Sequence, residues 1–233
     1  MKTSLFSFSL VILLAGCSKK ELVNPSQEIR QFKVSFVPGV AKTFDANWQQ
    51  VLGGKATIEF SAKASDTLTA SSLRDTIELK TLKSYTKQMA AGKYDITLKT
   101  ESTAAADTFI RFDAEVKDFH VKADGAIGLS AITTDGVITI SQTLIQAGSR
   151  PTFIPAGSTS ILNFGLANGH YFIYVKGGES GKITFTEATT GDEFMKNLPV
   201  VALTRYNLLP VLSSKAQWVF SQNRFSIGTP ATK

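Results

Sequence analysis

Apolar and polar residues alternate with a period of two along most of the chain after residue 31. In residues 32–36 (FKVSF), Phe32, Val34 and Phe36 face one side, and the two residues between them face the other. Such alternation is typical of antiparallel strands that are buried on one face only. The same pattern recurs in ATIEFSA (56–62), DITLKT (95–100), FIRFDAEV (109–116), GVITIS (136–141), KITFTEA (182–188) and QWVFS (217–221).

Helical patterns are few and short. The segments DANWQQVL (45–52) and GDEFMKNL (191–198) predict at most two helical turns each, and residues 72–90 fit either a helix or strands. The sequence therefore predicts a nearly all-β protein.

A proline- and glycine-rich stretch at residues 146–158 (QAGSRPTFIPAGS) separates two strand-rich halves. We expect two antiparallel β-sandwich domains in tandem, at residues 31–147 and 148–233, with an immunoglobulin-like or transthyretin-like fold. Lys93-Tyr94 and Arg205-Tyr206 each open a predicted strand, one in each half. This echo fits either a duplication or the shared pattern of all β-sandwiches.

The beginning of the chain has the parts of an export signal. Lys2 is followed by an apolar run at residues 5–14, which is too short to cross a membrane as a helix. The sequence Leu14-Ala15-Gly16-Cys17 resembles the lipobox of bacterial lipoproteins. The resemblance implies that residues 1–16 are a signal peptide, that Cys17 is acylated, and that the polar residues 17–30 tether the fold to the membrane.

Cysteine and charge narrow the function classes. Cys17 is the only cysteine, so a lipidated chain would contain neither a free thiol nor a disulfide. The net charge of +6 falls to +5 when Lys2 is removed with the signal peptide, and the longest basic run is Lys19-Lys20. A nucleic-acid-binding protein would gather its basic residues on one face, so we expect no nucleic-acid partner.

Motifs for metals, cofactors and nucleophiles are missing from the sequence. His120 and His170 lie fifty residues apart, without metal-ligand spacing. Residues 177–182 (GGESGK) do not match a phosphate-binding loop and predict a hairpin turn instead. The Asp-Gly pairs in residues 122–128 and 133–138 fit a calcium site or, more simply, turns. We expect no cofactor, no metal and no enzyme activity.

One group of charged residues could serve a glycosidase, which needs two carboxylates at a suitable separation. Asp113, Glu115 and Asp118 lie in one predicted strand with Arg111 and Lys117. Because the charges alternate in sign, a solvated strand face is the favoured interpretation.

Four aromatic residues are candidates for contact with a ligand such as a glycan: Trp48, Tyr171, Tyr174 and Trp218. In HYFIYVK (170–176), alternation places Tyr171 on one face of a strand and Tyr174 on the other. Such rings either fill the cores or expose a surface on which a sugar can stack.

The lipobox, the tether, the two β-sandwich halves and phrases such as AAGKYDITLKTES (90–102) resemble the small tandem-domain lipoproteins of the Bacteroidetes, including the fimbrillin-like group. The resemblance implies that the β-sandwich domains have a fimbrillin-like fold. It also implies a structural or adhesive role in surface fimbriae, with assembly by insertion of a partner strand into a sandwich. In that group, polymerising subunits are trimmed at an arginine, for which Arg30 and Arg74 are the candidates here.

The expected location is the outer membrane, to which acyl chains would anchor the protein. Surface exposure is favoured, although residues 18–21 (SKKE) lack the acidic cluster of exported surface lipoproteins, so a protein facing the periplasm stays an alternative. The alternative function is a glycan-binding surface lipoprotein of an uptake system. A hydrolase or an inhibitor is a third and weaker alternative.

Overall fold

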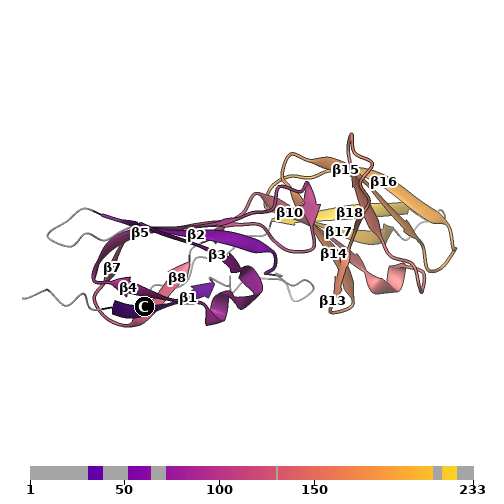
Figure 1. The fold of residues 1–233 in the computed structure, drawn as a ribbon. Coiled ribbons are helices and arrows are strands. Elements are labelled where there is room, and N and C mark those ends of the chain that lie inside the picture. The colour runs from indigo at the N-terminus through magenta and orange to yellow at the C-terminus, as the bar shows by residue number, and fades with distance from the viewer. Residues whose placement is uncertain (1–30, 39–51, 64–71, 130, 212–216, 225–233) are drawn as a thin grey trace, which may run out of the picture. The chain divides into compact units, whose positions relative to one another are not determined.

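The structure is a computed structural model that describes residues 31–38, 52–63, 72–129, 131–211 and 217–224 (Figure 1). Almost all of these residues lie in β-strands, and the helical turns among them are short 3-10 helices. The expected all-β fold with antiparallel sheets is thereby confirmed. The predicted signal peptide, Cys17, the tether, Trp48 and most of the expected helix at 45–52 lie outside the described residues.

The first set of strands forms two sheets, with the orders β4-β1-β8 and β3-β2-β5-β7-β9. A 3-10 helix, Leu79–Ser84, joins β3 to β4. The strands are β1 (Gln31–Pro38), β2 (Lys55–Ala62), β3 (Leu73–Glu78), β4 (Thr86–Ala90), β5 (Gly92–Thr100), β7 (Asp113–Val121), β8 (Gly125–Leu129) and β9 (Ala131–Ile132).

The second set also forms two sheets, with the orders β13-β14-β10-β17-β18 and β12-β11-β15-β16. The short strand β6 (Ala106–Asp107) pairs with β14, although it lies between β5 and β7 in the chain. The other strands are β10 (Asp135–Ser141), β11 (Thr152–Pro155), β12 (Leu162–Asn163), β13 (Gly165–Ala167), β14 (His170–Lys176), β15 (Ser180–Thr186), β16 (Glu193–Pro199), β17 (Thr204–Val211) and β18 (Gln217–Arg224).

The two sets share one topology. In each, the first strand longer than two residues is central in a sheet, antiparallel to one neighbour and parallel to the other: β4-β1-β8 in the first set, β14-β10-β17 in the second. The other sheet of each set also has the same strand order: β3-β2-β5-β7 in the first set corresponds, strand by strand, to β12-β11-β15-β16 in the second. Strand β18 has no counterpart among the described strands of the first set. The domain boundary expected at residue 147 stays a prediction, and β10 already pairs with the later strands.

The topological repeat does not coincide with the echo in the sequence. Tyr94 lies in β5, whose counterpart is β15, whereas Tyr206 lies in β17, whose counterpart is β8. Both rings are buried near the start of a strand, and both hydroxyls bond to the backbone just upstream. The Tyr94 hydroxyl donates to the carbonyl oxygen of Ala90 (3.0 Å), and the amide of Val201 donates to the hydroxyl of Tyr206 (2.9 Å). The echo in the sequence therefore reflects a shared local motif, in which a buried tyrosine near the start of a strand bonds through its hydroxyl to the preceding backbone.

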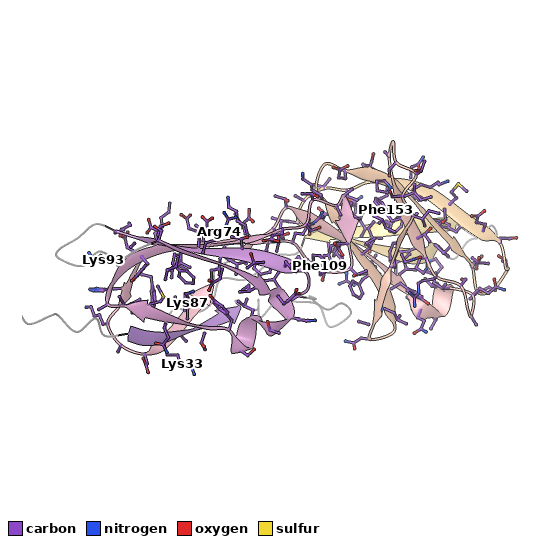
Figure 2. All side chains as sticks on the ribbon, in the orientation of Figure 1. Lys33, Arg74, Lys87, Lys93, Phe109 and Phe153 are labelled. Carbon is purple, nitrogen blue, oxygen red and sulfur yellow. The ribbon has the colours of Figure 1, made fainter. Side chains whose placement is uncertain are left out.

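Each strand set has a hydrophobic core, and strand β14 contributes to both core clusters. Phe172 and Tyr174 belong to the cluster that also contains Phe60, whereas Tyr171, Ile173 and Val175 belong to the cluster around Phe153. Figure 2 shows Phe153 within the second set of strands and Lys93 at the surface. The expected placement of Tyr171 and Tyr174 on opposite faces of one strand is confirmed.

Residues 191–198 are not helical, because most of them form β16. This strand pairs with β15 over seven residues, and the ring of Phe194 stacks on that of Phe185 with 4.6 Å between the centroids. Tertiary packing thus overrides the local helical pattern. The ambiguous residues 72–90 form β3, the 3-10 helix and β4.

Two turn predictions are wrong. The predicted turn at residues 177–182 is present, and in it the Glu179 amide donates to the Lys176 carbonyl oxygen. It joins β14 and β15, which belong to different sheets, so it is not a hairpin. Asp135-Gly136 opens strand β10 instead of forming a turn. A Cβ atom on Gly136 would lie 2.5 Å from Cγ1 of Val200, so glycine is needed there for close packing.

Candidate functional site

Catalytic and metal-binding groups do not converge among the described residues. His120 is exposed on β7, and half-buried His170 opens β14. Within the described parts of the chain, no three His, Cys, Asp or Glu side chains are grouped as metal ligands would be.

Asp113 and Glu115 lie on an exposed face of β7, where Glu115 pairs with Lys117 at 3.3 Å. Asp118 instead pairs with Lys63 at 2.6 Å. Most of this charged segment is a solvated face, as expected.

Arg111 departs from that expectation, because it is buried and paired with buried Asp135. Its Nη2 lies 2.8 Å from Oδ1 of Asp135, its Nε lies 3.1 Å from both carboxylate oxygens, and its backbone amide donates to Oδ2 at 2.9 Å. The guanidinium also donates to the carbonyl oxygens of Ala104 and Ala105, next to β6. Arg111 therefore ties the segment around β6 to the start of β10.

Sequence reasoning missed this pair because its members lie 24 residues apart. A signal was present, however. Arg111 is flanked by Phe109, Ile110 and Phe112, and Asp135 directly precedes the apolar stretch of residues 136–140. A charged residue embedded in apolar sequence is buried only when it is paired.

A cleft of about 210 Å³ lies over the Arg111–Asp135 pair. Small-molecule sites usually occupy about 300–1,000 Å³ and are mainly apolar. The cleft is smaller and rich in hydroxyl groups, so its geometry does not favour a cofactor or substrate site. It is lined by Thr100, Ser102, Thr103, Ala104, Arg111, Phe112, Asp113, Ile132, Thr133, Thr134, Asp135 and Lys176.

The candidate aromatic platform is not available at its two described rings. Tyr174 is 0% exposed and Tyr171 is 7% exposed. A ring that is enclosed by the core cannot stack on a sugar, so the prediction of ligand contact is wrong for these two tyrosines. Trp48 and the side chain of Trp218 lie outside what the structure describes.

One side of the first strand set is closed by a polar cluster. The carboxylate of Asp75, on edge strand β3, accepts hydrogen bonds from the Tyr85 hydroxyl (2.5 Å) and from Nζ of Lys87, on edge strand β4 (2.7 Å). The hydrogen bond from Lys87, followed by that from Tyr85, holds the pKa of Asp75 below its ordinary value of 3.8. Burial, with the neighbouring carboxylate, raises the pKa of Tyr85.

Asp75→Asn is expected to lower stability at neutral pH, with an effect that shrinks as the solution becomes acidic. The depressed pKa means that the unfolded chain protonates Asp75 first. The stabilisation is therefore present above pH 3.8 and is lost as the pH falls through the folded-state pKa. Urea unfolding of the wild type and the variant between pH 7 and pH 3 measures the difference. Asp192→Asn, at an exposed residue, is the control, and a difference that does not change with pH would contradict the prediction.

The other side of the same strand set ends at β8. Its residues Gly125, Ala126 and Gly128 are exposed, whereas Ile127 is buried in the core. Gly125 lies on the same face as Ile127 because the two are two positions apart in the strand. The corresponding face of β17 carries Tyr206 and Leu208, both buried.

Edge strands are usually protected by charge, by proline or by shortness. Strand β8 (GAIGL) has no charged residue and no proline. Among the described strands, only β1 pairs with β8, whereas β18 covers the equivalent edge of β17 along its whole length. Other edges follow the rule: β16 carries Glu193, Lys196 and Pro199, β3 carries Arg74, Asp75 and Glu78, and β9 and β12 have two residues each.

Searches with the sequence found no matching family model and no matching curated protein. Similar solved structures include a fimbrial assembly protein from Parabacteroides distasonis, with 8% identity and a TM-score of 0.47, over 84% of this chain and 99% of that one. A candidate cell adhesion protein from Bacteroides uniformis has 11% identity and a TM-score of 0.46, over 83% and 98%. A C-terminally truncated fimbrial tip protein from Porphyromonas gingivalis has 6% identity and a TM-score of 0.40, over 84% and 100%.

No described helix has the length and apolar character that crossing a membrane requires.

Proposed function

We propose that this chain is a non-enzymatic, lipid-anchored protein of the cell envelope with a structural or adhesive role. The observation that carries the proposal is the composition of edge strand β8, which has no charged residue and no proline. Among the described strands β8 pairs only with β1, whereas the equivalent edge of β17 is covered by β18. An extended segment of another envelope protein, or of a second copy, adds to β8 as β18 adds to β17. Main-chain hydrogen bonds supply the affinity in this mode of association, so no catalytic group is needed.

The side chains at the edge suit an incoming strand. Gly125 is exposed and carries no side chain on the face that it shares with buried Ile127. In the second strand set, the equivalent added strand places half-buried Phe220 opposite Leu208. A partner strand with a large apolar residue facing Ile127 would extend the core in the same way, which favours an alternating apolar and polar partner segment.

The membrane anchor is proposed on the sequence pattern at Cys17. Two or more acyl chains bind a bilayer stably, since each buried CH₂ contributes about 0.8 kcal/mol. Outer-membrane placement with the folded part at the cell surface remains our proposal. Glycan capture loses its two described candidate rings, because Tyr171 and Tyr174 are buried.

A photoreactive residue at position 126 is expected to crosslink in living cells to an extended segment of another polypeptide. Ala126 is exposed on β8, and a paired strand lies about 4.5–5.5 Å away between Cα atoms. Mass spectrometry of the adduct identifies the crosslinked segment. The matched control places the same group at Lys99, which is exposed on β5 but flanked by β2 and β7. Adding Gly128→Lys to the chain that carries the photoreactive group at 126 should abolish the product. Equal crosslinking at both positions, or none at 126, would contradict strand addition at β8.

A further inference from the structure

Two pairs of strands in the described chain are parallel, and all the others are antiparallel. Strand β1 pairs in parallel with β8 from Val34↔Gly125 to Pro38↔Leu129, and β10 pairs in parallel with β17 from Val137↔Arg205 to Ile140↔Leu208. Each pair joins the first long strand of a set, β1 or β10, to the last strand of the repeated topology, β8 or β17. Each parallel pair therefore connects an early strand of its set directly to a late one.

Parallel pairing determines how tension acts on the hydrogen bonds. The start of β1 and the end of β8 lie at opposite ends of their shared ladder. A pull on these two points slides the strands past one another and loads all the bonds of the ladder together. In an antiparallel pair joined by a hairpin, the free ends lie at the same end of the ladder, and the bonds break one after another.

The first strand of each set is also held on its other side. Strand β1 pairs with β4 from Gln31↔Ala90 to Ser35↔Thr86, and β10 pairs with β14 from Asp135↔Lys176 to Ser141↔His170. Val137, Ile138, Thr139 and Ile140 of β10 are each 0% exposed, so sliding this strand would also expose core residues to water.

We propose that each strand set contains a mechanical clamp, which carries tension through shear of its parallel pair: β1–β8 in the first set and β10–β17 in the second. In the cell, this clamp would hold load between an envelope anchor and a bound partner, and that use rests on the proposed function. The clamp itself is a property of the isolated chain and is measured without any partner.

Strand β18 provides a comparison within the same molecule. It runs antiparallel to β17, with Arg224 opposite Thr204, so its end lies at the same end of the sheet as the start of β10. A pull after residue 224 peels β18 from β17 bond by bond. We therefore expect β18 to detach at low force, before the β10–β17 pair yields.

The test for the first set uses single-molecule force spectroscopy on the full chain with Cys17→Ser, in which introduced cysteines are the only thiols. Lys33→Cys with Gly128→Cys places the handles at opposite ends of the β1–β8 ladder. Lys33→Cys with Ala123→Cys places them at the same end, where the Lys33 amide donates to the Asp124 carboxylate at 2.8 Å. All three positions are exposed. The rupture force of the first pair should be several-fold higher at the same loading rate.

The second set offers an independent comparison. Thr134→Cys with Leu209→Cys pulls the β10–β17 ladder from opposite ends, and Thr134→Cys with Val201→Cys pulls it from one end. Denaturant unfolding of each variant establishes that the members of a pair have equal equilibrium stability. Several-fold force ratios in both sets are the expected result. Ratios near one in both sets would overturn the clamp even if a β8 partner is found, and a missing partner would leave the force ratios unchanged.

Discussion

Arg111→Ala is expected to lower the free energy of unfolding by about 3–5 kcal/mol, because the substitution leaves a buried carboxylate without its partner. Asp135 is 1% exposed, and Arg111 supplies three of the hydrogen bonds from side chain to carboxylate. The variant also removes the donors to the carbonyl oxygens of Ala104 and Ala105, so the pairing of β6 with β14 should weaken. Urea unfolding, with the baselines of the folded and unfolded states both recorded, measures this decrease in the free energy of unfolding.

Two comparisons isolate the effect of burial. The double variant Arg111→Met with Asp135→Leu should recover much of the stability, since an apolar pair has no charge to desolvate. Arg74→Ala removes an exposed pair with Glu59 at 3.4 Å and should cost only about 0–1 kcal/mol. A cost for Arg111→Ala as small as that for Arg74→Ala would mean that the carboxylate of Asp135 is solvated in solution.

Tyr174→Ala and Ile173→Ala are both expected to be strongly destabilising, although the two residues point to opposite faces of β14. Truncation of a large buried aromatic residue costs about 3–5 kcal/mol and that of a buried isoleucine about 2–5 kcal/mol. Tyr174 packs in one core cluster and Ile173 in the other, and both are 0% exposed. Chemical denaturation of the two single variants measures both costs.

A strand with one solvated face would give a different result, with one of two adjacent truncations nearly neutral. Met195→Ala on β16 provides that reference, because Met195 is 55% exposed and its loss should change stability by no more than about 0.5 kcal/mol. If either β14 truncation behaves like Met195→Ala, then one face of β14 is open in solution.

Sequence alternation predicted the strands that have one solvated face. In β15, buried and half-buried residues alternate along the whole strand, and in β2 Ile58 and Phe60 are buried as expected. Alternation carries less information where both faces are covered. In β10, every residue from Asp135 to Ile140 is buried, so the role of Asp135 could not be read from a period of two.

Long-range packing set the features that the sequence could not predict. Residues 193–199 form a strand because β15 and Phe185 lie beside them, which overrides a short helical pattern. The topological repeat cannot be seen in the sequence, because counterpart strands occupy the same position in the fold but differ in their residues. On the inward face, β8 carries Gly125 and Ile127, whereas its counterpart β17 carries Tyr206 and Leu208.

Protease treatment of intact cells, with Cys17→Ala as the matched variant, decides whether this chain is an anchored protein of the cell envelope. We expect the wild type to be in the membrane fraction and to be degraded in intact cells, whereas Cys17→Ala is no longer retained by the membrane. Degradation only after the outer membrane is permeabilised would place the folded part in the periplasm and contradict the surface role. A wild type that stays in the cytosolic fraction, unchanged by Cys17→Ala, would contradict the envelope function altogether.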